Sequence, residues 1–123
     1  MLELENKKIL YLDDTKSELE LFGDEFSKLT KNLILFHYQD ESLEELTEKI
    51  ILENPDIVLL DYNLSTTLKG SDVCKKLREE NFSGTIIGFS TVPCKERFLE
   101  SGADSFILKD VRNPKSIIEE LRK

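Results

Sequence analysis

Residues 55–64 read PDIVLLDYNL, in which a short apolar run, 57–60, is closed by Asp61. A run of this length without polar alternation is typical of a strand buried on both faces of a parallel sheet. Ligands of open α/β sheets bind outside the carboxyl ends of such strands. The position of Asp61 therefore makes it a candidate site residue.

Four more apolar runs share this character, at residues 9–12, 33–38, 85–89 and 105–108. Amphipathic stretches separate them and predict helices over 17–31, from Ser42 onward, over 71–81, over 94–101 and from Asn113 onward. The alternation indicates five βα units with right-handed crossovers. We expect a doubly wound α/β protein with helices on both faces of a five-stranded parallel sheet.

Local signals mark the predicted helix ends. Thr15-x-x-Glu18 and Ser42-x-x-Glu45 each match a capping box. Gly102 is a natural stop for the fourth helix, and Asn113-Pro114 supplies a cap and a first-turn proline for the fifth. The apolar side chains that these helices are expected to turn toward the core are Leu19, Phe22, Phe26, Leu29, Leu43, Leu46, Ile50, Ile51, Val73, Cys74, Leu77, Ile117, Ile118 and Leu121.

The composition bounds the class of protein. The 123 residues carry a net charge of −8 and 39% are hydrophobic, which suits a single domain over residues 1–123. The acidic excess argues against direct nucleic-acid binding, and no apolar run is long enough to cross a membrane. We find no secretory signal and take Cys74 and Cys94 as reduced thiols, so we expect a cytoplasmic protein.

Polar side chains follow four of the predicted strands. Asp13-Asp14 closes the first strand, Asp61 the third, Ser90-Thr91 the fourth and Lys109 the fifth. Each has an ordinary explanation as a turn former, a cap or a solvated charge, but together they converge on one sheet edge. The set suits phosphoryl transfer assisted by Mg²⁺, because that ion favours oxygen ligands and no cysteine–histidine cluster exists for zinc. One carboxylate would attack phosphorus, while the ammonium and a hydroxyl would stabilise the phosphoryl oxygens.

The segments ILYLDD, PDIVLLDYNL, IIGFST and GADSFILK occur in this order along the chain. With their spacing they resemble the receiver domain of bacterial response regulators, and the chemotaxis regulators in particular. The resemblance covers essentially the whole chain and implies a flavodoxin-like strand order, 2-1-3-4-5. It also implies a signalling phosphoacceptor of a two-component system rather than an enzyme.

The resemblance implies a role for each acidic strand-end residue. Asp61 matches the phosphoacceptor and contributes to the Mg²⁺ site. Asp14 matches the direct Mg²⁺ ligand, and Asp13 matches the acid that holds a metal-bound water. Asn63 falls where the family supplies a backbone carbonyl to the metal.

The resemblance also implies a switch and its partners. Ser90 matches the switch hydroxyl, and Lys109 matches the ammonium that pairs with the phosphoryl group. Phe106 matches the aromatic switch, although a core aromatic explains it equally well. The implied donor is a histidine kinase or a histidine phosphotransfer protein, and an unknown output protein would bind the fourth helix, fifth strand and fifth helix. A homodimer through that surface stays open, while nucleic acid and membrane are not expected as direct partners.

Several positions depart from the family pattern. Asp110 replaces the proline that normally follows the lysine, so we expect a trans bond or a remodelled loop, since a cis bond without proline costs about 3 kcal/mol. The segment from Ser90 to Gly102 is shorter than usual, Ser65 replaces a common proline, and Gly70 comes one residue late. These departures surround the site without removing its charged residues.

Two alternatives stay open. A pseudo-receiver that works without phosphorylation is mildly favoured by the unusual loops and opposed by the complete set of charged residues. A small Mg²⁺-dependent phosphohydrolase is opposed because its usual Asp-x-Asp pair is absent: Tyr62 and Asn63 follow Asp61. His37 is expected to be structural because it falls within a strand, whereas a phosphodonor histidine would be exposed on a helix.

Overall fold

Strands and helices alternate along residues 4–122, the part of the chain that the computed structural model describes. The elements in chain order are β1 (Lys8–Asp13), α1 (Lys16–Phe26), β2 (Asn32–His37), α2 (Leu43–Glu53), β3 (Ile57–Leu60), α3 (Gly70–Glu79), β4 (Thr85–Ser90), α4 (Lys95–Glu100), β5 (Ser105–Leu108) and α5 (Ser116–Leu121). The predicted order of elements is confirmed.

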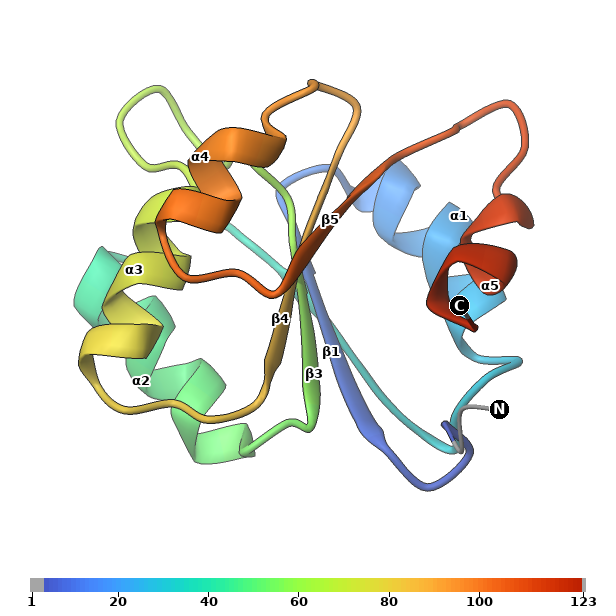
Figure 1. Cartoon of the computed structure of the whole chain (residues 1–123), viewed down its shortest axis with the longest axis horizontal. Coiled ribbons are helices and arrows are strands. Elements are labelled where there is room, and N and C mark those ends of the chain that lie inside the picture. The colour runs from blue at the N-terminus through green and yellow to red at the C-terminus, as the bar shows by residue number, and fades with distance from the viewer. Residues whose placement is uncertain (1–3, 123) are drawn as a thin grey trace.

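The strands form one parallel sheet in the order β2-β1-β3-β4-β5, which confirms the flavodoxin-like topology. β1 pairs with both β2 and β3, so the chain changes its direction across the sheet at β1. Figure 1 shows α1 and α5 on one face of the sheet, and α2, α3 and α4 on the other. In sheets of this kind ligands bind at the carboxyl ends of the strands beside the change of direction.

Apolar side chains fill the space on both sides of the sheet. Leu60 and Phe98 belong to the layer under α2, α3 and α4, and Tyr11 belongs to the layer under α1 and α5. The central strands β1, β3 and β4 are almost wholly buried, whereas Leu35 of β2 and Leu108 of β5 are 44% and 55% exposed. The prediction of burial on both faces is therefore wrong for the edge strands, because they have a neighbouring strand on one side only. None of the described helices has the length and hydropathy to span a membrane.

The first helix begins differently from the prediction. Thr15 is the N-cap of α1, but its side chain makes no capping hydrogen bond. Its backbone N–H, which a capping box would give to Glu18, donates to Asp13 Oδ1 at 2.9 Å. The carboxylate of Glu18 binds Lys109 instead. The predicted capping box is therefore wrong, because Glu18 has a charged partner that outcompetes a backbone N–H.

Two helix boundaries differ from the predicted ones. α1 ends at Phe26 rather than at residue 31, since the hydroxyl of buried Thr30 donates to the Lys7 carbonyl and turns the chain toward β2. α5 begins at Ser116 rather than at Pro114, the first residue after the predicted Asn113 cap. The backbone N–H of Ser116 donates to the Asn113 carbonyl three residues earlier, so a tighter turn precedes the α-helix.

The other helix predictions are largely confirmed. Ser42 and Glu45 form the predicted capping box, with Glu45 N to Ser42 Oγ at 3.1 Å and Ser42 N to Glu45 Oε1 at 3.0 Å. Ile51, however, is 36% exposed, because the buried stripe of α2 runs along Leu46, Thr47 and Ile50. Residues 70–79 form α3 where 71–81 was predicted.

Candidate functional site

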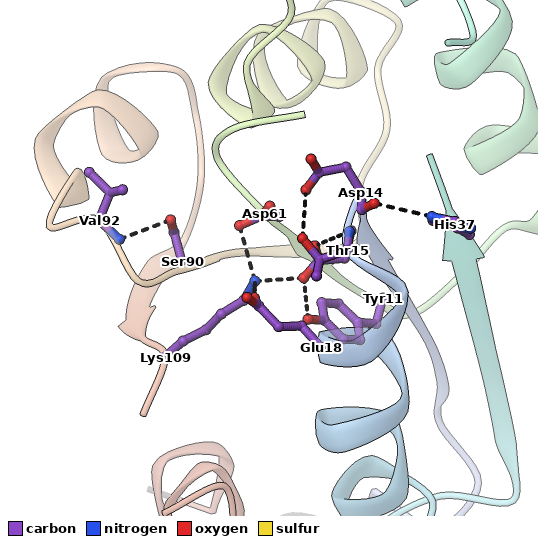
Figure 2. A network of polar contacts seen from close by, with 10 residues as sticks. Tyr11, Asp14, Thr15, Glu18, His37, Asp61, Ser90, Val92 and Lys109 are labelled. Carbon is purple, nitrogen blue, oxygen red and sulfur yellow. Dashed lines mark hydrogen bonds and ion pairs between the residues drawn. The ribbon is translucent and has the colours of Figure 1, made fainter. Parts of the chain in front are cut away.

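Side chains from the carboxyl ends of separate strands meet at one edge of the sheet. Asp13 is the last residue of β1, Asp61 follows β3, and Lys109 follows β5. Backbone bonds extend the ladder past the strand ends: Asp61 N–H donates to the Leu12 carbonyl at 3.1 Å, and Lys109 N–H donates to the Ser90 carbonyl at 2.8 Å. This register brings the side chains together, as Figure 2 shows for Asp61 and Lys109.

Lys109 is the centre of the charged network. Its Nζ donates to Asp13 Oδ2 at 2.6 Å, to Glu18 Oε1 at 2.7 Å and to Asp61 Oδ1 at 3.1 Å. The ammonium also lies 5.4 Å from the ring centre of Phe89, and the residue is only 5% exposed. A buried ammonium is stable only with such partners, because an unpaired charge in the interior is costly.

Asp13 is fully buried and accepts hydrogen bonds from several directions. Besides Lys109 and the Thr15 N–H, the hydroxyl of Tyr11 donates to its Oδ2. Burial, and then the charge of Asp13, raise the pKa of Tyr11 well above its ordinary value. The tyrosine therefore keeps its proton and remains a donor that fixes the Asp13 carboxylate.

The acids of the site repel one another. Burial raises the pKa of Asp61 to about 7; Lys109 opposes this rise, and the charges of Asp13 and Asp14 add to it. Burial alone would lower the pKa of Lys109, but attraction to Asp61 and Asp13 holds it above its ordinary value. The lysine therefore stays protonated. The carboxylates still outnumber it, so their repulsion favours binding of an additional cation at the site.

Three carboxylates could together hold a metal ion. Asp13, Asp14 and Asp61 each offer an oxygen, and these oxygens lie within 4.8 Å of one another. Asp14 is exposed, so the group is open to water on its side. A donor set of oxygens with room for retained waters fits Mg²⁺.

Asn63 follows Asp61 by two residues, at the start of the loop between β3 and α3. Its side-chain oxygen accepts a hydrogen bond from Lys69 Nζ at 3.1 Å. The next turn also approaches closely: a Cβ on Gly70 would lie 1.9 Å from the Asp61 carbonyl oxygen, so only glycine fits there. The β3–α3 loop is thus folded tightly against Asp61.

The predicted switch residues lie apart from the charged network. Ser90 is buried, and its Oγ accepts the Val92 N–H at 3.1 Å, on the far side of Asp61 in Figure 2. Phe106 is half-buried and stacks on Phe98 with ring centres 5.9 Å apart. Phe106 packs against the same apolar layer as Phe98, on the sheet face that α4 covers, and Ser90 lies on that side of β4 with Ile86 because side chains alternate along a strand.

The remaining residues that the sequence singled out have structural surroundings. His37 ends β2, and its Nε2 lies 3.1 Å from the Asp14 carbonyl oxygen. Cys74 and Cys94 are buried free thiols, and burial raises the pKa of Cys74 to about 11. Residues 4–122 contain no cis peptide bond, so the expected trans bond after Lys109 is confirmed.

Asp110 has a clear local function in place of proline. Its Oδ1 accepts the Arg112 N–H at 3.1 Å and the Asn113 N–H at 3.2 Å. A carboxylate that binds the backbone two and three residues later forms a turn without fixing the preceding peptide bond. The turn between β5 and α5 is therefore stabilised by the carboxylate of Asp110, where the family pattern uses a proline ring.

Two residues of the network were missed by sequence reasoning. Glu18 was assigned to a capping box, and Tyr11 was counted only as part of a strand. A signal for Tyr11 existed, since it precedes Asp13 by two residues on the same side of β1 and a buried tyrosine hydroxyl needs a partner. For Glu18 the signal was its place in the first helical turn after a strand that ends at the site.

A doubly wound parallel sheet in the order β2-β1-β3-β4-β5 defines a flavodoxin-like α/β protein, and acids that could hold a cation lie with a lysine at its carboxyl edge. The family model of the response regulator receiver domain matches residues 9–122. The chain therefore belongs to the response regulator receiver family, which consists of signalling phosphoacceptor domains of two-component systems. A comparison with curated protein sequences found no match.

Solved structures agree with this assignment. The BeF3-activated receiver domain of Klebsiella pneumoniae RstA is 26% identical, with a TM-score of 0.75 and coverage of 94% of this chain and 95% of that chain. Two others show the shared fold. Chemotaxis response regulator CheY4 of Vibrio cholerae is 18% identical, with a TM-score of 0.77 and coverage of 94% and 96%. The Borrelia burgdorferi CheX–CheY complex with BeF3 and magnesium is 21% identical, with a TM-score of 0.73 and coverage of 97% and 91%.

Proposed function

We propose that this protein accepts a phosphoryl group on Asp61 from a histidine kinase or a histidine phosphotransfer protein, with Mg²⁺ bound. The modified protein then presents an altered α4–β5–α5 surface to an output protein. The domain works in the cytoplasm as a signalling switch, and it assists only its own phosphorylation and dephosphorylation.

One observation carries this proposal: Asp61 adjoins both the other two acids of the site and a buried ammonium. Its carboxylate is grouped with Asp13 and Asp14, and its Oδ1 lies 3.1 Å from Lys109 Nζ. Phosphoryl transfer needs a nucleophile beside charges that stabilise the phosphoryl oxygens, and this arrangement supplies both.

The chemistry follows from the residues present. A carboxylate oxygen of Asp61 forms a bond to phosphorus as the bond from phosphorus to the leaving nitrogen or oxygen breaks, and the leaving group takes that electron pair. Lys109 donates to an oxygen of the transferred group, and Ser90 turns from the Val92 N–H toward it. Asp13, Asp14, Asp61 and the carbonyl of Asn63 would hold Mg²⁺, which supplies charge neutralisation among the carboxylates and the phosphoryl oxygens when it is bound.

The output surface is argued from its exposed apolar side chains. Leu99 of α4, Leu108 of β5 and Val111 after β5 are 40%, 55% and 47% exposed. When Ser90 moves, Phe106 repacks inward beside Phe98, and this repacking changes the positions of the exposed apolar side chains. Phosphorylation then shifts a pre-existing equilibrium between two conformations of this surface.

Intact mass spectrometry after incubation with acetyl phosphate and Mg²⁺ tests the proposal. We expect one added phosphoryl group, absent without Mg²⁺ and absent in Asp61→Asn. Asp24→Asn, an exposed aspartate on α1, is the matched control and should be modified like the wild type. Addition that persists in Asp61→Asn would contradict the assignment of the acceptor. Failure to bind Mg²⁺ together with no addition would favour the pseudo-receiver.

A further inference from the structure

We propose that Glu18 is a positioning residue that competes with the phosphoryl group for Lys109 and so favours the unmodified state. This inference rests on the proposed function of Asp61. It concerns a carboxylate that comes from α1 rather than from a strand end, and that the sequence pattern had assigned to helix capping.

The donors of Lys109 are fully used before any phosphoryl group arrives. An ammonium has three N–H groups, and Asp13, Glu18 and Asp61 each accept from it within 3.1 Å. A phosphoryl group on Asp61 takes away the charge of that carboxylate and replaces its contact with Lys109, so its oxygens share the lysine with the two carboxylates that stay charged, Asp13 and Glu18. The competitor that yields more easily determines how strongly the unmodified state resists the change.

Exposure identifies Glu18, rather than Asp13, as the competitor that yields more easily. The side chain of Asp13 is fully buried and that of Asp61 is 10% exposed, whereas that of Glu18 is 27% exposed. Asp13 is also held by Tyr11 and by the Thr15 N–H, so its release would break further hydrogen bonds. Glu18 lies in the first turn of α1, where its carboxylate can exchange the ammonium for water.

The strength of the Glu18 contact then sets the threshold for activation. At 2.7 Å it is shorter than the 3.1 Å contact between Lys109 and Asp61, the acid that accepts the phosphoryl group. Removing the charge of Glu18 weakens its hold on one N–H of Lys109 in the unmodified state, so a phosphoryl oxygen competes for that N–H more easily. Loss of the Glu18 charge should therefore strengthen binding of a phosphoryl group at Asp61.

Beryllofluoride provides an equilibrium test, because this trigonal anion has the shape and charge distribution of a phosphoryl group on a carboxylate. We would titrate it in the presence of Mg²⁺ and follow amide resonances of the folded protein by NMR. Glu18→Gln should bind beryllofluoride about threefold more tightly than the wild type, the ratio expected for a partly exposed ion pair. Glu20→Gln removes the same charge from an exposed position of α1 and should bind like the wild type.

Glu18→Asp separates contact from charge. It keeps the negative charge but shortens the side chain, so it should resemble Glu18→Gln if the contact with Lys109 is what matters. Equal affinities for the wild type and Glu18→Gln, a parallel change in Glu20→Gln, or weaker binding by Glu18→Gln would each overturn the inference while leaving the proposed function intact. A wild type that binds no beryllofluoride and takes no phosphoryl group from acetyl phosphate would overturn both.

Discussion

The ring of Phe98 on α4 occupies the space above Gly88 of β4, such that a Cβ on Gly88 would lie 2.4 Å from Cδ2 of Phe98. Phe98 is fully buried and also contacts the rings of Tyr62 and Phe106, at 6.0 and 5.9 Å between ring centres. The short helix α4 therefore packs on the sheet largely through one aromatic side chain, which fits only because Gly88 has no side chain.

Gly88→Ala tests this packing. The added methyl group cannot be accommodated without moving Phe98, and we expect a loss of about 1–3 kcal/mol in the free energy of unfolding. Urea denaturation of Gly88→Ala, Phe98→Leu and the double variant measures it. In the Phe98→Leu background the alanine should cost clearly less, because the smaller side chain leaves room. An equal cost in both backgrounds would show that the contact is not the cause.

Mg²⁺ should stabilise the folded protein through its acidic group. At a concentration tenfold above the dissociation constant, a ligand that binds the folded state adds about 1.4 kcal/mol to the free energy of unfolding. The melting temperature of the wild type should therefore rise with Mg²⁺. Asp14→Ala removes one carboxylate of the group and should abolish most of the rise, whereas Asp24→Ala, an exposed aspartate on α1, should preserve it. A full rise in Asp14→Ala would place the metal elsewhere.

Because of the buried thiol of Cys74, we expect the free energy of unfolding to fall at alkaline pH. Burial raises its pKa to about 11 from an ordinary value of 9.0, so the unfolded chain releases this proton first as the pH rises. Its contribution to stability is complete below pH 9 and is lost between pH 9 and about 11. Urea midpoints of the wild type and Cys74→Ala, compared at intervals across this range, isolate the effect from that of other titrating groups. A constant difference between the two proteins would disprove it.

The two matched capping sequences should respond differently to alanine. Ser42 accepts the Glu45 N–H, so Ser42→Ala should lower the free energy of unfolding by about 1 kcal/mol. Thr15 makes no capping hydrogen bond with its side chain, so Thr15→Ala should cost less. Thermal unfolding of the two variants beside the wild type provides the comparison. A larger loss at Thr15 would mean that its hydroxyl contributes through another contact.

These two motifs also show what the sequence can and cannot predict. The strand ends were predictable, because apolar runs fix where each strand stops and parallel strands bring their carboxyl ends together. Asp13, Asp61 and Lys109 follow from that rule alone. The role of Glu18 does not follow from it. The pattern Ser42-x-x-Glu45 forms a capping box, whereas in the matching pattern Thr15-x-x-Glu18 the glutamate forms an ion pair with Lys109. The difference depends on a lysine far away in the sequence, which only the assembled fold brings near.

The hydrogen bond between Lys109 and Asp13 joins residues 96 positions apart, so it also has a consequence for how the chain folds. β1, β2 and β3 precede β5 along the chain and can pair before Lys109, which neutralises Asp13, joins the sheet after β5, the last strand of the described sheet. Until then the growing sheet carries a cluster of acids without its cation, and their repulsion opposes closure of that edge. We therefore expect β5 to dock in the same step that neutralises the cluster, so that the charged network forms only when all five described strands are paired.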